Sequence, residues 1–281
     1  MSYLAIAVLA VIQGLAELLP VSSSAHVIVA ERLMGLDPSS PAMTFLLVML
    51  HTGTTFAVIL YFWPRWKARL AASAERNSLA VALAVATAAT GIVGLALKKL
   101  IEKVFMRGDG KAEIEMLFSN LPLVAGALAA AGLLILWAGG KPKPEQPLTP
   151  ERALHVGVMQ GLCLPFRGFS RSGATISAAM LCGIPRALAE DFSFALSVIL
   201  TPAVIFLETH RLMKAAAAAG RPAFEPALFA PGLVGMVFSF AAGLLALRWL
   251  SSWLERGRWR WFGYYCLAAS AGVLGAAAWL R

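Results

Sequence analysis

Six apolar runs of about 20 residues constrain the fold of this chain more than any other feature. A helix of about 20 apolar residues is long enough to cross ~30 Å of hydrocarbon. A closed β-barrel, the other fold that spans a membrane, needs strands that alternate over roughly 10 residues, and these runs do not alternate. We therefore predict an all-α integral membrane protein, folded as a single membrane domain over residues 1–281. The predicted spans are 43–63, 77–97, 116–138, 190–209, 228–250 and 262–280.

The composition supports a membrane setting and argues against a nucleic-acid partner. Hydrophobic residues make up 59% of the chain and charged residues only 14%, whereas soluble domains are ~25% charged. The net charge of +9 is best explained by basic loops that contact anionic lipid headgroups. Such loops are predicted between the spans, for example "WPRWKAR" and "KKLIEKVFMRGDGKAEIE". Attraction of an anionic substrate is the alternative reading of the charge.

Two further apolar segments, 3–36 and 154–184, are each interrupted halfway by polar residues. Each is predicted to form two half-length helices joined by a break. At membrane depth, a broken helix is tolerated only where it is buried in protein or lines a cavity. Both segments are therefore predicted to be re-entrant hairpins.

These two segments match each other at an offset of 147 residues, which places "VIQGL" (11–15) on "VMQGL" (158–162). The three later spans recur at nearly the same spacing, so we predict two repeats, about 1–140 and 148–281. Each repeat contains a re-entrant hairpin and three transmembrane helices. Because three is odd, the second repeat must be inverted relative to the first. The hairpin tips can then meet near the midplane, where inverted-repeat proteins build their binding sites.

The first hairpin contains "QGLAELLPVSSSAH". Gln13 and Glu17 are four residues apart and so share one helix face. A proline follows, and Ser22, Ser23 and Ser24 stand where the second half-helix would begin. Serine is a good N-cap, and a helix N-terminus offers free N–H groups and partial positive charge.

The second hairpin contains "QGLCLPFRGFSRSGATIS". Ser170, Arg171 and Ser172 stand at the predicted start of its second half-helix, which continues through Thr175. Gly173 allows a ligand to approach the backbone closely. If the tips meet, two helix N-termini, several hydroxyls and an arginine converge. That combination is an oxyanion site, for which phosphate is the natural ligand.

An ionisable group inside the membrane is expensive and indicates function. Glu17 could hold a divalent cation (Mg²⁺ or Ca²⁺) that bridges phosphate oxygens, or it could orient His26. His26 lies three residues after Ser23, and could act as its general base or attack phosphorus itself. Two structural alternatives remain open: Arg171 could simply pair with Glu17, and the serines could hydrogen-bond between helices. His51 lies in a span and is a weaker candidate.

These residues resemble the bacterial undecaprenyl-diphosphate phosphatases of the bacitracin-resistance type. "QGLAELLPVSSSAH" matches the family's (E/Q)xxxE segment with its Ser/His continuation, and "RGFSRSGAT" resembles its PGxSRSxxT segment. Arg167 stands at the motif's proline. The resemblance covers essentially the whole chain. It implies functional roles for Gln13, Glu17, Ser23, His26, Ser170, Arg171 and Thr175.

The resemblance implies an enzyme of the bacterial cytoplasmic (inner) membrane. It would hydrolyse a C55 polyprenyl diphosphate to the monophosphate carrier of cell-wall synthesis, confer bacitracin resistance, and use a divalent cation. We expect Ser23 to be the nucleophile, His26 its base, Arg171 the phosphate clamp, and Glu17 a ligand of the metal or a partner of His26. The expected phosphate-binding residues are Gln13, Ser22, Ser24, Ser170, Ser172, Gly173 and Thr175.

A transporter or flippase of a phosphorylated lipid is the rival function, because inverted repeats with broken helices are also typical of transporters. It would use the same anion site. The sequence leaves the oligomeric state, the prenyl chain length and the membrane face of the site open.

Overall fold

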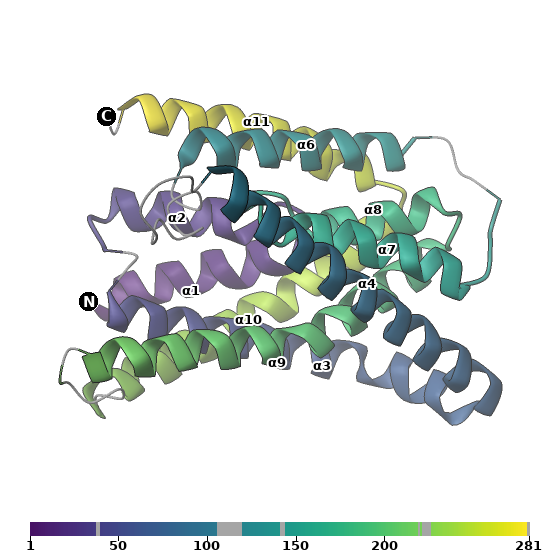
Figure 1. Cartoon of the computed structure of the whole chain (residues 1–281), viewed down its shortest axis with the longest axis horizontal. Helices are drawn as coiled ribbons and strands as arrows, with labels where there is room; N and C mark the ends of the chain where they lie inside the picture. Colours follow the sequence, from purple (N-terminus) through teal and green to yellow (C-terminus); the bar gives the residue numbers. More distant parts are fainter. Residues whose placement is uncertain (38–39, 106–119, 141–143, 219, 221–225, 280–281) are drawn as a thin grey trace.

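The computed structural model describes residues 1–37, 40–105, 120–140, 144–218, 220 and 226–279, and within these ranges the regular structure is α-helical (Figure 1). The helices are α1 (Tyr3–Leu18), α2 (Ser23–Leu33), α3 (Pro41–Ala71), α4 (Ser73–Phe105), α6 (Leu121–Ala138), α7 (Pro150–Cys163), α8 (Arg171–Leu181), α9 (Arg186–Ala218), α10 (Pro226–Glu255) and α11 (Trp259–Trp279).

Six of the described helices, α3, α4, α6, α9, α10 and α11, are long and apolar enough to cross a membrane. The predicted all-α membrane fold with six spans is therefore confirmed. The described part of each predicted span falls inside one of these helices, except that Asn120 of the third span is the N-cap of α6. Residues 116–119 of the third span and residue 280 of the sixth lie outside the described residues.

Two segments expected to be loops are instead helical. α3 continues through "WPRWKAR" to Ala71, and α4 continues through "KKLIEKVF" to Phe105. The first extension is held against α9, because Arg65 Nη1 lies 3.2 Å from carboxylate oxygens of both Glu190 and Asp191. This contact between distant parts of the chain explains why a basic, proline-containing stretch stays helical.

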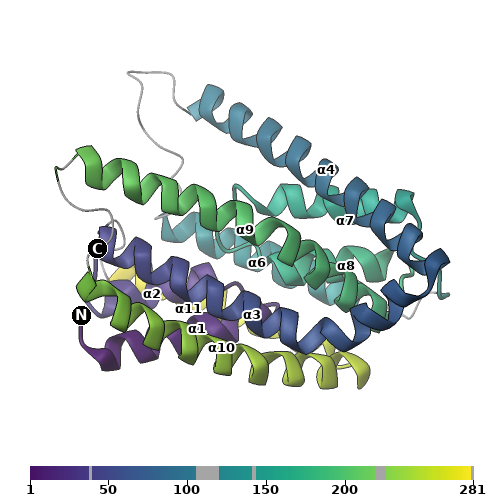
Figure 2. The ribbon, with the colours of Figure 1, turned by 90° about the horizontal axis from the view of Figure 1, so that it is seen from below.

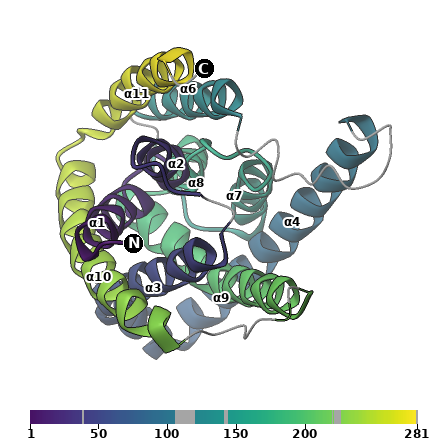
Figure 3. The ribbon, with the colours of Figure 1, turned by 90° about the vertical axis from the view of Figure 1, so that its left-hand side faces the viewer.

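The two remaining helix pairs form the predicted hairpins. α1 and α2 enter the bundle from one end and α7 and α8 from the other, and their tips meet in the middle (Figure 1). α1 has 16 residues and α7 has 14, which is shorter than the ~20 residues of a full span. Seen end-on, α2 and α8 lie in the interior, with the spanning helices arranged around them (Figure 3).

Each hairpin packs through a glycine against a spanning helix. A Cβ on Gly14 of α1 would overlap Ser239 and Ala242 of α10, and one on Gly161 of α7 would overlap Val93 of α4. Because lipid gives helices little hydrophobic reason to associate, small residues that allow close backbone approach stabilise such pairs. Gly14 and Gly161 are equivalent under the 147-residue offset. The view from below shows α3 running beside α10 (Figure 2).

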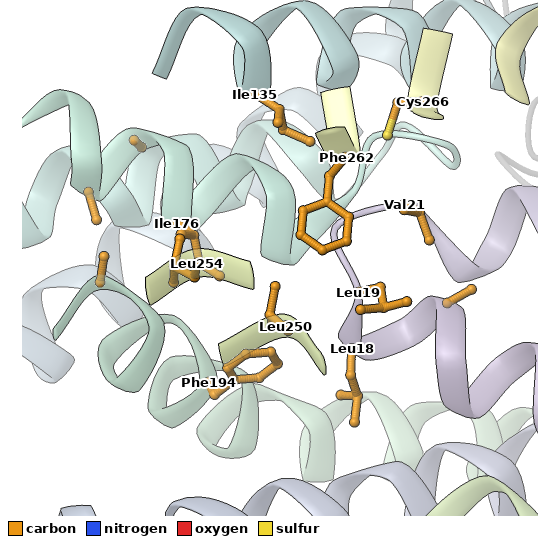
Figure 4. Close-up of a cluster of buried hydrophobic side chains, with 14 of the residues drawn as sticks. Leu18, Leu19, Val21, Ile135, Ile176, Phe194, Leu250, Leu254, Phe262 and Cys266 are labelled. Atoms are coloured by element: carbon orange, nitrogen blue, oxygen red, sulfur yellow. The ribbon is translucent and has the colours of Figure 1, made fainter. Parts of the chain in front are cut away.

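The tip of the first hairpin is anchored in the apolar core. Leu18, Leu19 and Val21 lie in a cluster that also contains Phe194 of α9 and Phe262 of α11 (Figure 4). All five side chains are buried. Close packing of this kind resists displacement. The apolar side of the tip therefore fixes the position of the polar residues that flank it.

Candidate active site

The tips of the two hairpins contact each other directly. The backbone N–H of Gly168 donates to Ser24 Oγ at 3.2 Å. The hydroxyl of Ser172 donates to the carbonyl of Leu19 at 3.3 Å. The N-termini of α2 and α8 therefore lie close together.

Glu17 is the centre of a hydrogen-bond network that joins the tips. Its Oε1 accepts a 2.7 Å hydrogen bond from Arg171 Nη2. Its Oε2 accepts hydrogen bonds from Ser23 Oγ at 2.5 Å and from Gln13 Nε2 at 3.3 Å. The alternative in which Arg171 pairs with Glu17 therefore describes a contact that the structure contains. Arg171 also lines the adjoining cavity, so pairing does not remove it from the site.

A cavity of about 190 Å³ lies between the tips. Leu164, Phe166 and Phe169 form an apolar part of its wall. The remaining lining residues are Ala16, Glu17, Ser22, Ser23, Ser24, His51, Cys163, Arg167, Ser170 and Arg171. This combination of a charged, hydroxyl-rich end and an apolar wall suits an anionic headgroup attached to an apolar chain.

The N-terminus of α2 is shaped to receive an anion. Ser22, its N-cap residue, has a φ of 65° and makes no side-chain cap to the first turn. It is the only non-glycine residue with positive φ in the described part of the chain. Its hydroxyl instead lies 3.2 Å from Ser24 Oγ. No capping side chain therefore accepts from the N–H groups of the first turn, which leaves them able to bind an anion. A non-glycine residue with positive φ, such as Ser22, is strained, and strain of this kind is typical of functional sites.

The N-terminus of α8 is arranged differently. Ser170 lines the cavity and caps the helix, because its hydroxyl accepts from the N–H of Gly173 at 3.2 Å. Thr175 bonds to the carbonyl of Arg171 at 2.9 Å and to the hydroxyl of Ser193. Ser172 is engaged with the other tip, as described above. Ser172, Gly173 and Thr175 thus shape the second tip, whereas Ser170 and Arg171 border the cavity itself.

His26 is placed away from the residues it was expected to serve. Its Nδ1 lies 2.8 Å from the carbonyl oxygen of Ser22, and its Nε2 lies 2.7 Å from Tyr265 Oη. The imidazole also stacks on the Tyr265 ring of α11. The expected contacts with Ser23 and Glu17 are not formed among the described residues, because Ser23 Oγ is bonded to Glu17 and both imidazole nitrogens are engaged elsewhere.

His51 of α3 enters the site more closely than its weak sequence signal indicates. Its Nδ1 lies 2.8 Å from the carbonyl of Leu47 and must therefore carry the proton of that hydrogen bond. Its Nε2 is then an acceptor for Gln13 Nε2 at 3.3 Å, and lies 3.9 Å from Glu17 Oε2. The Gln13 amide thus bridges Glu17 and His51. The available signal was a histidine within an apolar span, which is costly without a function.

Comparisons with known proteins show the family to which the chain belongs. A family model described as "Bacitracin resistance protein BacA" matches residues 6–272. The chain belongs to this family. A relative from Acinetobacter baylyi, "Undecaprenyl-diphosphatase 2", is 56% identical over 278 residues, 98% of each chain. "Undecaprenyl-diphosphatase 1" of Burkholderia pseudomallei is 35% identical, over 95% of this chain and 94% of the relative. "Undecaprenyl-diphosphatase" of Korarchaeum cryptofilum is also 35% identical, over 95% and 96%.

In this BacA family member, the described residues contain no group of three or more His, Cys, Asp or Glu side chains that could hold a metal ion. Among the residues that the structure describes, Glu17 is the one carboxylate that lines the cavity. Mg²⁺ commonly keeps several waters and binds through one or two carboxylates together with substrate phosphates. The donor set therefore fits a cation that arrives with a phosphorylated substrate better than one held in a protein cage.

Proposed function

We propose that this protein is an undecaprenyl-diphosphate phosphatase, which releases the terminal phosphate of the lipid and leaves the monophosphate. One observation carries the proposal: Glu17, Ser23 and Arg171 meet on the wall of one cavity at the junction of two helix N-termini. They supply a nucleophile (Ser23), a proton acceptor (Glu17) and a positive charge (Arg171), which are the groups that phosphoryl transfer requires. Membership of the BacA family and the names of the relatives support the same activity.

The proposal includes the inverted-repeat organisation, with repeats of about 1–140 and 148–281. Two features of the packing support it. α1 packs on α10 and α7 packs on α4, which are exchanged pairs under the repeat relationship. The matched glycines Gly14 and Gly161 make these two contacts. With one hairpin from each repeat, the active site belongs to both halves.

Ser23 is the proposed nucleophile. Its hydroxyl donates to Glu17 Oε2, so Glu17, rather than His26, is positioned to take the proton. The Ser23 Oγ–P bond forms as the bond between the terminal phosphorus and the bridging oxygen breaks, and the lipid monophosphate leaves. Water then hydrolyses the phosphoserine, which releases inorganic phosphate and regenerates the serine hydroxyl.

Charge neutralisation comes from Arg171 and the two helix N-termini. The terminal phosphoryl group carries negative charge that spreads over its oxygens in the transition state. The guanidinium of Arg171 and the unclaimed N–H groups of α2 are donors in fixed positions, so they stabilise that charge without reorganisation. A divalent cation, Mg²⁺ or Ca²⁺, would be held by the diphosphate oxygens with Glu17 as its protein ligand. It would neutralise further charge on the phosphates.

His26 is proposed to position the first tip. It bonds the Ser22 carbonyl on one side and Tyr265 on the other, and so holds the strained turn next to Ser23. The alternative from the sequence, with His26 as the nucleophile, requires Nε2 to leave Tyr265, while Nδ1 can keep its bond to the Ser22 carbonyl. The site is proposed to act in the bacterial cytoplasmic membrane, where it recycles the lipid carrier for cell-wall synthesis and confers bacitracin resistance.

The experiment is phosphate release from undecaprenyl diphosphate by the purified protein in detergent, where no gradient exists. We expect turnover by the wild type and its loss in Ser23→Ala and Arg171→Ala. Arg256→Ala, which removes an exposed charge outside the cavity lining, is the matched control and should retain turnover. No release in detergent, together with movement of the lipid between vesicle leaflets, would establish the transporter instead.

A second experiment assigns the nucleophile. The protein is quenched in acid during turnover of substrate labelled in its terminal phosphate, and the labelled peptide is identified by mass spectrometry. Phosphate on Ser23 is the expected result. Phosphate on His26 would reverse the assignment.

A further inference from the structure

Arg167 is a second guanidinium on the wall of the cavity, and the mechanism above does not use it. It lies in the turn between α7 and α8, four residues before Arg171, and its side chain is exposed. Ser22, Ser23, Ser24 and Arg171 line the same cavity. The cavity of about 190 Å³ holds several water volumes at about 30 Å³ each, so it has room for more than one phosphate group.

The backbone on which Arg167 stands is held firmly. Its neighbour Gly168 has a φ of 101°, and a Cβ at that position would collide with the backbone of Val124 in α6. The N–H of Gly168 donates to Ser24 Oγ in the opposite tip. The turn is therefore clamped between α6 and the first hairpin, and Arg167 keeps a fixed position relative to the serines.

Glu31 is a buried carboxyl group that interacts electrostatically with Arg167. This residue of α2 is only 1% exposed. Its Oε1 has no hydrogen-bond partner in the described part of the chain, which is costly for a buried carboxylate. Its electrostatic attraction to Arg167 partly offsets that cost. A carboxyl group with spare acceptor capacity, coupled electrostatically to a guanidinium that borders a cavity, is a counter-ion that an anionic ligand can displace.

The charge of the side chains in the inner site explains why a second guanidinium favours a diphosphate, with or without a divalent cation. Arg171 is already paired with Glu17 at 2.7 Å, so these two groups together contribute no net charge. A diphosphate brings two phosphate groups, and the helix N-termini supply only partial charges of about half a unit each. Arg167 adds a second guanidinium on the same wall. Its charge becomes available to a phosphate when the attraction to Glu31 is given up.

We propose that Arg167 forms a subsite for the second phosphate of a diphosphate, the one that stays on the lipid, and exchanges Glu31 for that phosphate when substrate binds. Arg171 then binds the phosphate that is transferred. The subsite makes the protein prefer two-phosphate ligands over one-phosphate ligands. Its place in the reaction rests on the proposed diphosphatase function.

The test measures binding without turnover. Methylenediphosphonate, a two-phosphate probe that cannot be hydrolysed, and inorganic phosphate are titrated into the detergent-solubilised protein by calorimetry. Arg167→Ala should weaken diphosphonate binding at least tenfold and change phosphate binding less than twofold. Arg167→Lys should restore part of the loss, because it keeps the charge without the planar fork. Arg256→Ala, matched for the charge removed, should bind both probes like the wild type.

A double-mutant cycle tests the part played by Glu31. Glu31→Gln should tighten diphosphonate binding severalfold in the wild-type background, because it removes the anion that competes for Arg167. In the Arg167→Ala background the same change should have no effect. If Glu31→Gln changes diphosphonate affinity equally in both backgrounds, Arg167 does not exchange Glu31 for phosphate.

Failure of the subsite is distinguishable from failure of the proposed function. If Arg167→Ala binds diphosphonate like the wild type, or weakens both probes equally, the subsite is wrong whatever the turnover. If diphosphonate binding depends on Arg167 but the wild type releases no phosphate from the lipid, the subsite is supported and the diphosphatase function is contradicted.

Discussion

Arg171 Nη2 and Glu17 Oε1 lie 2.7 Å apart although 154 positions separate them in the sequence. This ion pair joins the tips of two hairpins that enter the bundle from opposite ends (Figure 1). Because Glu17 also accepts from Ser23, the contact that closes the tertiary structure is part of the proposed chemistry. Substitutions here should therefore separate catalytic from structural effects.

Glu17→Gln should lower turnover by about 10²- to 10⁴-fold, the usual contribution of a general base. Glutamine has nearly the same shape and keeps a carbonyl acceptor, so the protein should still fold and be purified normally. Phosphate release from undecaprenyl diphosphate is the measurement, with folding checked by the elution profile in detergent. Turnover within tenfold of the wild type would exclude Glu17 as the base for Ser23.

His51→Leu should reduce turnover about tenfold or more, because one N–H of the Gln13 amide loses its acceptor while the other keeps Glu17. An unsatisfied buried donor costs about 1–3 kcal/mol. His51→Gln should retain most activity, since the glutamine carbonyl can accept the same hydrogen bond. His155→Gln is the matched control, because His155 is exposed on α7 and its Nδ1 contacts only the backbone of Glu151 in the described structure. If both His51 variants match the wild type, His51 has no role in the site.

Tyr265→Phe should lower turnover by less than about tenfold, because it removes one hydrogen bond worth about 0.5–1.5 kcal/mol. His26→Ala should cost more, since it also releases the carbonyl of Ser22 and the strained turn that precedes Ser23. Both variants should still form the phosphoserine in the quench experiment. Complete loss of labelling in His26→Ala, with the protein folded, would contradict a purely positioning role.

Gly157→Ala should destabilise the contact between α7 and α4 by about 1–3 kcal/mol, the usual cost of overpacking. The added methyl would collide with the backbone of Ala86, which cannot move like a flexible side chain. Gly91→Ala in α4 is the control, because no atom lies within 4 Å of the added Cβ. The midpoint temperature of thermal unfolding in detergent should fall for the first variant and stay near the wild-type value for the second. Equal midpoints would show that this helix pair can separate without cost.

Arg65→Met should destabilise the protein by about 3–5 kcal/mol, because buried Glu190 loses its cationic partner. Asp191 then keeps only the longer contact with Arg69, at 3.5 Å. Arg65 Nη1 bonds to Glu190 and Asp191, which are 2% and 4% exposed. Glu75→Ala breaks an exposed ion pair with Arg69 and should cost only about 0–1 kcal/mol. Thermal unfolding in detergent compares the two.

The double change Glu190→Gln with Asp191→Asn should recover part of the stability that Arg65→Met loses, because it removes the stranded charges. If Arg65→Met is no more destabilising than Glu75→Ala, the network contributes nothing to the attachment of α3 to α9.

The sequence by itself determined the parts of this protein that depend on composition and spacing. Apolar runs of spanning length specify the six long helices because the bilayer sets the length of a helix. The polar breaks near Ser22 and Ser170 predict the hairpin tips, because proline disfavours continuation of a helix. At Pro64, by contrast, α3 stays helical and its Arg65 pairs with α9. The matched QG segments placed the two tips in equivalent positions, so the encounter of Arg171 with the first hairpin could be anticipated.

Only the tertiary structure decided which side chains meet within the site. Ser23 reaches Glu17 and His26 turns to Tyr265, 239 positions away, because the rotation of α2 is set by packing against its neighbours. The same holds for His51, whose helix could present it to lipid or to Gln13 with an identical local sequence. Helical periodicity determines which residues share a face of a helix. Long-range packing determines which neighbouring side chains that face contacts.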